Sequence, residues 1–463
     1  MNDTANDTIY ALATPPGRSA IAVIRISGQD ASKTPVLFSV PCPCAGQFSV
    51  CRLIQAGKVI DQVILLFMKG PISSTGEDVC EIHCHGSQAV IDSILGKLGK
   101  TSGFRLAGAG EFTKRSFLNG KIDLSGVEGL ADLIDAQTPT QLHQAWAQID
   151  GALRAPVMAW RTKLIDIAAQ LEALIDFVDE NLPLTIEQSL RKSTNDLKMA
   201  LAENLADGGF GELVRDGVVV ALVGPVNVGK STIINGLAGR AAAIVSTEAG
   251  TTRDIIQVQL DLQGVPTTIL DTAGIRETKG VIESEGIKRS IGAANKADLV
   301  LIILDGSDKH WPSSRAKIDK VLGIGTDEAN ADSGYRRLYV LNKADCIKDN
   351  FDYRDKFSEN DDVLVISAKR PIDLKLLSDT LATKLTPLNH AEGSVIITRQ
   401  RHRQAIQAAH DALCRALGYN FHDEPELAAE DFRLAAAALG RITGEIDIEE
   451  LLGSIFSAFC IGK

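Results

Sequence analysis

The chain of 463 residues lacks several features that define other classes of protein. Its longest apolar runs, such as DLVLIILD, have the length of a strand and not of a membrane span. Its eight cysteines show no framework of regular spacings, and no apolar leader precedes the first expected strand. We therefore expect a reduced, cytoplasmic protein without a disulfide scaffold and without a membrane segment.

An excess of positive charge is also missing. The chain has 48 Lys and Arg against 59 Asp and Glu, for a net charge of −11 and a pI near 5.3. Such a chain is not a general binder of polyanions, so any contact with RNA needs a local basic patch or a partner. The length exceeds what one hydrophobic core supports and indicates about three domains.

A phosphate-binding loop is the strongest positive signal. Residues 224–231 read GPVNVGKS, between the apolar segment 217–223 and an expected helix that begins at Lys230. Here the glycines turn backbone N–H groups toward a triphosphate, while the helix N-terminus and Lys230 add positive charge. Ser231 then offers a hydroxyl to Mg²⁺. The alternative is a glycine turn followed by Lys-Ser by chance, but the setting predicts a nucleotide site.

Four further motifs indicate which base is bound. NKAD at 342–345, SAK at 367–369 and DTAG at 271–274 each follow an apolar strand, and TTRD at 251–254 lies in a polar loop. Asp345 can accept both N–H donors of a guanine edge, which adenine does not offer. Because ligands bind at the carboxyl ends of strands in doubly wound sheets, this order of motifs predicts GTP.

The usual catalytic groups of small GTPases are not in their places. A glutamine normally follows the Asp-x-x-Gly turn and orients the attacking water, but this position is Ile275. The loop between Ser246 and Thr252 has no obvious arginine finger either. Another device must therefore orient the water and neutralise the developing charge.

Motifs along the whole chain resemble the tRNA-modification GTPase family MnmE, also called TrmE. They are GPVNVGKS with Asn227, AIVSTEAGTTRD (243–254), DTAGIRET (271–278), the terminal FCIGK (459–463), TPPGRSAIAVIRISG (14–28) and GEFTKRSFLNGKIDL (110–124). Two departures are the reversed order of Pro225 and Val226, and Gly280 where the family commonly has an acidic residue. Neither removes an expected ligand.

For the nucleotide site, the resemblance implies a potassium ion in place of the arginine finger. Its ligands would come from Asn227, Ser246, Glu248 and Thr251, with Mg²⁺ held by Ser231 and Thr252. Glu283 would orient the water, although a solvated helix residue is the alternative. The complete set of expected GTP-binding residues is Asn227, Val228, Gly229, Lys230, Ser231, Thr232, Ser246, Thr247, Glu248, Ala249, Gly250, Thr251, Thr252, Asp271, Thr272, Ala273, Gly274, Asn342, Lys343, Ala344, Asp345, Ser367, Ala368 and Lys369.

For the N-terminal part, the resemblance implies a site for 5-formyl- or methylene-tetrahydrofolate. Arg25, Glu81 and Lys121 match the family's folate contacts, and Lys463 of the partner subunit reaches the same pocket. Without the resemblance, Arg25 is a surface-facing strand residue. Cys460 is either an inert thiol or a nucleophile or acid in the one-carbon transfer.

Two other clusters have alternative interpretations. In CEIHCH at 80–85, strand alternation puts Cys80 and Cys84 on one face and Glu81 with the two histidines on the other. A zinc site would need a second segment such as CPC at 42–44, and buried cysteines are the alternative. The basic run RQRHR at 399–403 is either a tRNA or partner surface or a solvated helix face.

The expected fold is a multidomain α/β protein. Residues 1–120 form an N-terminal α+β domain for tetrahydrofolate binding and dimerisation, and 215–386 form a Ras-like P-loop GTPase domain with a doubly wound sheet. Helical periodicity at 121–214 and 387–463 predicts one discontinuous all-helical domain into which the GTPase is inserted.

The resemblance implies a homodimeric, potassium-activated GTPase that works on tRNA with the flavoprotein MnmG (GidA), in a heterotetramer or a larger complex. Together they would add a carboxymethylaminomethyl or aminomethyl group to C5 of the wobble uridine. One alternative is a GTP-controlled ribosome assembly factor, which should carry an additional RNA-binding module. Another is a folate-dependent aminomethyltransferase with a purely regulatory GTPase.

Overall fold

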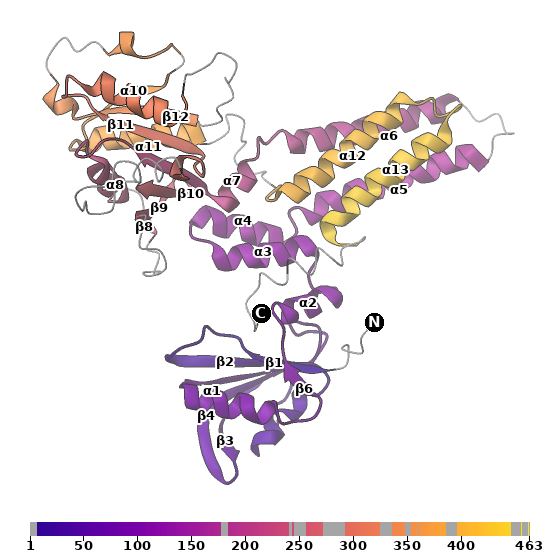
Figure 1. Cartoon of the computed structure of the whole chain (residues 1–463). Coiled ribbons are helices and arrows are strands. Elements are labelled where there is room, and N and C mark those ends of the chain that lie inside the picture. The colour runs from indigo at the N-terminus through magenta and orange to yellow at the C-terminus, as the bar shows by residue number, and fades with distance from the viewer. Residues whose placement is uncertain are drawn as a thin grey trace. The chain divides into compact units, whose positions relative to one another are not determined.

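The computed structural model describes residues 7–176, 184–239, 243–244, 256–271, 292–324, 336–347, 353–359, 361–385, 396–445, 455 and 462. The chain divides into two compact units: Met1–Ala131, Trp146–Asn195 and Asp411–Lys463 form one, and Asp132–Ala145 and Asp196–His410 form the other. Figure 1 shows the course of the chain. Within the described ranges, no helix combines the length and the apolar character that crossing a membrane requires.

A mixed six-stranded sheet forms the N-terminal module of the first unit. Its order is β3-β4-β5-β2-β1-β6, with β1 Thr8–Leu12, β2 Ser19–Ser27, β3 Phe48–Gln55, β4 Lys58–Met68, β5 Val79–Gly86 and β6 Phe104–Leu106. Helix α1 (Gln88–Leu98) packs its buried side chains Ile91, Ile94 and Leu98 against alternate residues of these strands. On the opposite face, Phe112 of α2 (Glu111–Leu118) contacts Ile9. The period-2 pattern of the strands thus decides which side chains enter the α1 core.

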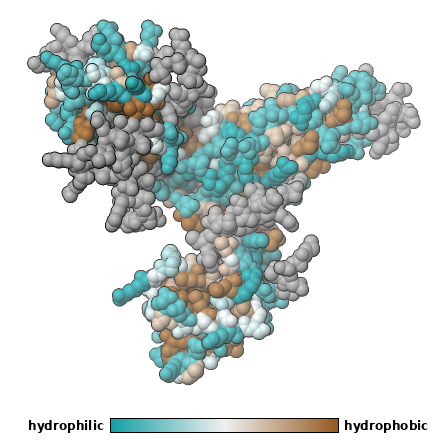
Figure 2. Space-filling view, in the orientation of Figure 1, coloured by the Kyte–Doolittle hydropathy of each residue, from teal (hydrophilic) through white to brown (hydrophobic). Residues whose placement is uncertain are grey.

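Part of this sheet exposes apolar side chains. Phe48 and Val50 on β3 and Val59 and Ile64 on β4 are between 41% and 69% exposed. The register pairs Val50 with Ile64, so these two lie on the same face. Figure 2 shows hydrophobic surface over this module.

Helices from both sides of the GTPase sequence pack together in the first unit. Helix α5 (Arg154–Asp176) packs along α13 (Pro425–Thr443), and the two run side by side in Figure 1. Arg191 of α6 (Leu184–Leu205) donates to the carbonyl oxygens of Leu417 and Tyr419, at 3.1 and 2.6 Å, where α12 (Gln400–Gly418) ends. A cation at this end satisfies carbonyls that the helix leaves unpaired. The expected packing of the two helical stretches is confirmed.

A seven-stranded sheet forms the core of the second unit. Its order is β13-β12-β11-β7-β10-β9-β8, with β7 Val218–Val223, β8 Ala243–Ile244, β9 Ile256–Leu262, β10 Val265–Asp271, β11 Leu299–Asp305, β12 Arg336–Asn342 and β13 Val363–Val365. Strands β13, β12, β11, β7 and β10 are parallel to their neighbours in this order, and β9 is antiparallel to β10. The predicted doubly wound GTPase sheet is confirmed.

Both faces of this sheet are covered, which explains its continuous apolar strands. On β11, Leu299, Leu301 and Ile303 enter one core with side chains of α8 (Lys230–Ala238) and α11 (Pro371–Leu385). The alternate residues of β11 enter the other core, which contains Trp311 of α10 (Trp311–Val321).

A helical corner is bonded to the nucleotide-binding sheet within the second unit. Thr138, just before α4 (Pro139–Ile149), donates to the carbonyl oxygen of Gly264 in the β9–β10 turn at 3.3 Å. Gln141 and Gln144 donate to the carbonyl oxygens of Arg215 and Gly211 at 3.0 Å each, on α7 (Phe210–Asp216). Since α7 leads directly into β7, these bonds fix the approach of the chain to the phosphate-binding loop.

Candidate functional site

The loop between β7 and α8 needs glycine at two positions. Gly229 has φ +100°, the left-handed region that favours glycine, and a Cβ there would lie 2.3 Å from Nδ2 of Asn342. At Gly224, a Cβ would lie 2.3 Å from the carbonyl oxygen of Ile303. The glycines therefore allow this loop to approach two other parallel strands, and the N-terminus of α8 lies at the carboxyl edge of the sheet.

Lys230 lies within this loop. Its side chain is 5% exposed, and Nζ donates to the carbonyl oxygens of Gly224 and Pro225, both at 2.7 Å. Burial lowers the pKa of Lys230, and the charge of Asp271 opposes that shift. Asp271 ends β10 and is 4% exposed, so the structure brings it to the same strand edge as the lysine.

Asn342 joins three of the predicted motifs. Its side chain is 2% exposed; Nδ2 donates to the carbonyl oxygen of Val228 at 2.8 Å, and Oδ1 accepts from the backbone N–H of Ala368 at 2.9 Å. Both ends of the amide thus bond to protein groups. Asn342 connects the phosphate-binding loop to the SAK turn and holds the base-binding side together.

The predicted base-binding residues also meet. Asp345 accepts from the hydroxyl of Ser367 at 2.7 Å and from Nζ of Lys369 at 3.2 Å. The hydrogen bond from Ser367 is the largest cause that lowers the pKa of Asp345 to about 2. Asp345 is therefore a carboxylate at neutral pH and can only accept hydrogen bonds, as recognition of a guanine edge requires.

The other predicted nucleotide and transfer residues include three exposed residues at the phosphate-binding loop and a set that lies outside the described residues. Asn227 is exposed with φ +64°, and Ser231 and Thr232 are exposed on the first turn of α8. The following lie outside the described residues: Ser246, Thr247, Glu248, Ala249, Gly250, Thr251, Thr252, Thr272, Ala273, Gly274, Glu283, Cys460 and Lys463.

A second polar cluster lies on the N-terminal sheet. Strand register pairs Arg25 with Glu81, and Nε of Arg25 lies 2.8 Å from Oε1 of Glu81. Nε2 of His83 lies 3.0 Å from the other carboxylate oxygen, and the guanidinium carbon of Arg25 lies 5.8 Å from the centroid of the Phe112 ring. Burial raises the pKa of Glu81, but the hydrogen bond from His83 and the charge of Arg25 lower it by more than burial raises it. The net shift of the pKa is therefore downward.

The described predicted folate residues have different partners. Arg25 and Glu81 are in contact, whereas Nζ of Lys121 donates to the carbonyl oxygen of Pro71 at 2.8 Å. His83 was not among the predicted site residues, although its position two residues after Glu81 already put both side chains on one strand face.

The side chains of the CEIHCH strand are divided between a buried core and ion pairs. Cys80 and Cys84 are buried in the α1 core, and burial raises the pKa of Cys80 and raises that of Cys84 to about 11. His85 pairs with Asp61 instead, with Nδ1 2.8 Å from the carboxylate. Among the residues with described positions, no group of three or more His, Cys, Asp or Glu side chains could hold a metal. The structure favours the buried-cysteine interpretation over zinc.

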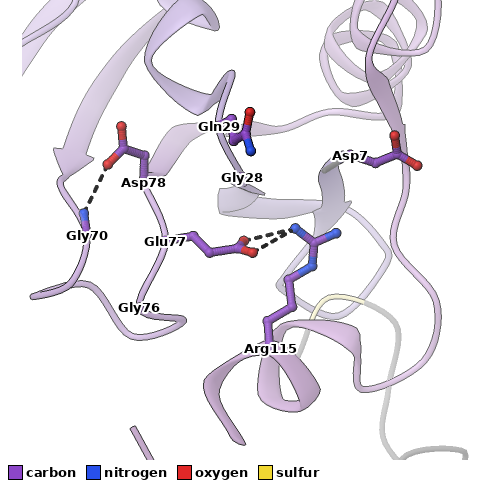
Figure 3. Close-up of a pocket in the computed structure, with 8 residues that line it drawn as sticks. All are labelled: Asp7, Gly28, Gln29, Gly70, Gly76, Glu77, Asp78 and Arg115. Carbon is purple, nitrogen blue, oxygen red and sulfur yellow. Dashed lines mark hydrogen bonds and ion pairs between the residues drawn. The ribbon is translucent and has the colours of Figure 1, made fainter. Parts of the chain in front are cut away.

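A cavity of about 430 Å³ also lies in the N-terminal module, apart from these clusters. Figure 3 shows the carboxylate of Glu77 facing Arg115 and one oxygen of Asp78 meeting the backbone N–H of Gly70. Arg115 is also paired with Glu111. Within the lining Glu77 and Arg115 neutralise each other, while Asp7 pairs with Arg105 outside it, and we assign the cavity no ligand. It is lined by Asp7, Gly28, Gln29, Gly70, Gly76, Glu77, Asp78 and Arg115.

The expectation that the basic run 399–403 forms a solvated or RNA-facing surface is wrong for most of its charge. Arg399 pairs with Asp132 at 2.7 Å, and Arg403 pairs with Asp207 at 2.6 Å and with Glu212 at 2.7 Å. His402 is fully buried. Acidic residues far away in the sequence neutralise the run, which periodicity along one helix does not reveal.

Two family models match the chain. The model described as the N-terminus of the GTP-binding protein TrmE matches residues 8–121, and the MnmE helical domain model matches residues 124–460. Among solved structures, an Era from Aquifex aeolicus aligns at 24% identity over 42% of this chain and 66% of that chain; its TM-score of 0.27 is too low to carry an argument.

Curated relatives match over nearly the full length. The tRNA modification GTPase MnmE of Parvibaculum lavamentivorans is 43% identical over 99% of this chain and 100% of the relative. The MnmE of Caulobacter vibrioides is 42% identical over 99% of this chain and 100% of the relative. The MnmE of Rhodospirillum rubrum is 41% identical over 99% of each chain. Matched in this way from end to end, the chain belongs to the MnmE family of tRNA modification GTPases.

Proposed function

We propose that this GTPase is activated by potassium and acts on tRNA together with an MnmG (GidA) flavoprotein. The pair adds a carboxymethylaminomethyl or aminomethyl group to C5 of the wobble uridine, using a tetrahydrofolate one-carbon unit. The observation that carries this proposal is the full-length similarity to tRNA modification GTPases, combined with a nucleotide site at the carboxyl edge of the sheet. It favours this function over a ribosome assembly factor, whose extra RNA-binding module has no counterpart in the sequence motifs.

In the nucleotide site, Asp345 selects guanine through its two carboxylate oxygens, and the loop 224–231 binds the phosphates. Lys230 exchanges its bonds to the loop carbonyls for bonds to phosphate oxygens. Ser231 fits a Mg²⁺ ligand because its hydroxyl is exposed on the first turn of α8. Bound Mg²⁺ supplies charge neutralisation at the phosphates, with Thr252 as the second proposed ligand.

Potassium fits the same loop. Asn227 presents an exposed carboxamide at the loop tip, and the oxygen of an amide is a suitable ligand for a hard cation. We assign the remaining ligands to Ser246, Glu248 and Thr251, and the water-orienting role to Glu283. A bound potassium ion supplies the positive charge that an arginine finger supplies elsewhere.

In the N-terminal module, Glu81 and Arg25 are proposed to contact tetrahydrofolate. Glu81 is 9% exposed and remains a carboxylate, which suits the N–H donors of a pterin edge. Lys121 and the partner subunit's Lys463 would meet the glutamate tail, and Cys460 is proposed to act in the transfer. The exposed apolar strands β3 and β4 support dimerisation through this module.

We propose domain limits of 1–120 for the folate and dimerisation domain and 215–386 for the GTPase. The helical domain comprises 121–214 and 387–463, and the complex with MnmG is a heterotetramer or larger and is cytoplasmic. This division leaves the GTPase inserted into helices that contact each other, so movement of the GTPase domains on hydrolysis can reach the modification site.

The test is GTP hydrolysis by the full chain in potassium and in sodium at matched ionic strength. We expect a rise of at least about tenfold in potassium, which Asn227→Ala abolishes. Asn235→Ala is the matched control, because Asn235 is exposed on α8 away from the loop. Equal wild-type rates in both salts would overturn the potassium mechanism.

A further inference from the structure

An ion pair joins the NKAD motif to a residue outside the recognised GTPase motifs, beside the base-binding turn. Nζ of Lys343 lies 2.6 Å from Oδ2 of Asp305, the last residue of β11. Strands β11 and β12 are parallel neighbours, and the register pairs Asp305 with Asn342. The carboxylate therefore projects from the strand next to the one that carries the NKAD motif.

Lys343 has an unfavourable backbone conformation and lies between two residues of the nucleotide site. Its φ is +66°, a left-handed conformation that is strained for a residue with a side chain. It lies between Asn342, which is bonded to the phosphate-binding loop, and Asp345, which is bonded to the SAK turn. The methylene stem of Lys343 consequently starts between the residues proposed for the phosphates and for the base.

Asp305 is itself fixed in place. Its Oδ1 accepts from the backbone N–H of Ser307 at 3.0 Å and from the hydroxyl of Ser307 at 2.6 Å. The backbone N–H of Gly306 donates to the carbonyl oxygen of Asn342 at 2.9 Å, which joins the ends of the two strands. Burial raises the pKa of Asp305, but the hydrogen bonds from Lys343 and Ser307 outweigh it, so the net shift is downward and the carboxylate is charged at neutral pH.

We propose that Asp305 is a positioning residue for guanine nucleotides, which holds the Lys343 side chain so that its stem lies against the bound base. The inference rests on the proposed guanine site. Asp305 acts through Lys343 and does not itself contact the nucleotide. Because the base is common to GDP and GTP, the loss of this support weakens both nucleotides equally and leaves the preference for guanine intact.

The test measures the affinity of the full chain for fluorescent GDP and GTP analogues in wild type, Asp305→Asn and Asp305→Ala. We expect affinity to fall about fivefold in Asp305→Asn and about tenfold in Asp305→Ala, mainly through faster dissociation. The matched control is Asp308→Asn, which makes the same change of charge at an exposed residue three positions away and should stay within about twofold of wild type.

A double-mutant cycle separates positioning from a general structural role. In a Lys343→Met background, Asp305→Asn should have no further effect on nucleotide affinity. An equal loss in both backgrounds, or unchanged or tighter binding by Asp305→Asn, would overturn the proposal. If the wild type binds adenine nucleotides as well as guanine nucleotides, the proposed guanine site fails instead, so the two failures are distinguishable.

Discussion

The nucleotide-binding edge of the second unit and the polar strand face of the N-terminal module are built in different ways. At the nucleotide edge, Asn342 and the backbone of neighbouring loops join motifs that are far apart in sequence. On the strand face, Glu81 bonds to Arg25 across the antiparallel pair of β2 and β5 and to His83 on its own strand. The first site depends on backbone shape, and the second on side-chain charge. Substitutions should therefore mainly change nucleotide affinity in the first region and local stability in the second.

The largest effect is expected for Gly229→Ala. A Cβ at this left-handed position displaces Asn342, so affinity for GDP should fall by about two orders of magnitude as backbone strain adds to broken hydrogen bonds. Fluorescence titration measures this. Gly323→Ala is the control, since Gly323 has φ +69° but nothing within 4 Å of a Cβ. A comparable loss in both variants would mean that φ alone, and not the contact with Asn342, explains the effect.

A smaller effect is expected for Asp345→Asn. An amide at this position opposes one guanine N–H donor with another donor, so GTP affinity should fall roughly thirtyfold. Xanthine nucleotides should then bind better than guanine nucleotides in a competition assay. Asp355→Asn, at an exposed residue of the same unit, serves as the control. Unchanged preference for GTP would contradict the base-recognition assignment.

On the strand face, Glu81→Gln should mainly affect stability. Loss of the charge that Arg25 and His83 share should lower the local free energy of unfolding of β2 and β5 by about 1–2 kcal/mol at pH 7. Hydrogen–deuterium exchange in the full chain measures this local stability. Asp92→Asn, an exposed carboxylate of α1, is the control.

The same variant has a defined pH dependence. The pKa of Glu81 is lower in the folded state than its ordinary value of about 4.3, so its stabilisation is present above that value and is lost as pH falls through the folded-state pKa. The difference between wild type and Glu81→Gln should therefore disappear in acid. A difference that persists to low pH would show that the carboxylate charge is not its source.

The smallest change in stability is expected for Lys121→Ala. Lys121 is exposed and bonds only a carbonyl oxygen in the contacts described, so local stability should change by less than about 0.5 kcal/mol. Binding of 5-formyltetrahydrofolate, measured by equilibrium dialysis, should nevertheless fall about fivefold. Lys114→Ala on α2 is the control, and equal affinity in both variants would exclude Lys121 from the folate site.

Sequence analysis predicted the strand face better than it predicted the surroundings of α12. The alternation on β5 correctly separated Cys80 and Cys84 from Glu81, because strand geometry alone decides which face a side chain occupies. The basic run 399–403 was misjudged because its neutralising partners Asp132, Asp207 and Glu212 lie between 191 and 267 residues away in the sequence. The spacing of charges within a helix contains no information about such partners.

The sequence by itself determined the GTPase sheet, the positions of the nucleotide motifs at strand ends and the family of the protein. These follow from local periodicity and from glycines whose backbone no other residue can easily adopt. Only the tertiary structure decided that Asn342 bonds to Val228 and Ala368, that His83 joins Glu81 and that Asp305 holds Lys343. The contacts of Asn342 and Asp305 join different strands or loops, whose juxtaposition depends on strand order and register, which the pattern along one chain does not specify.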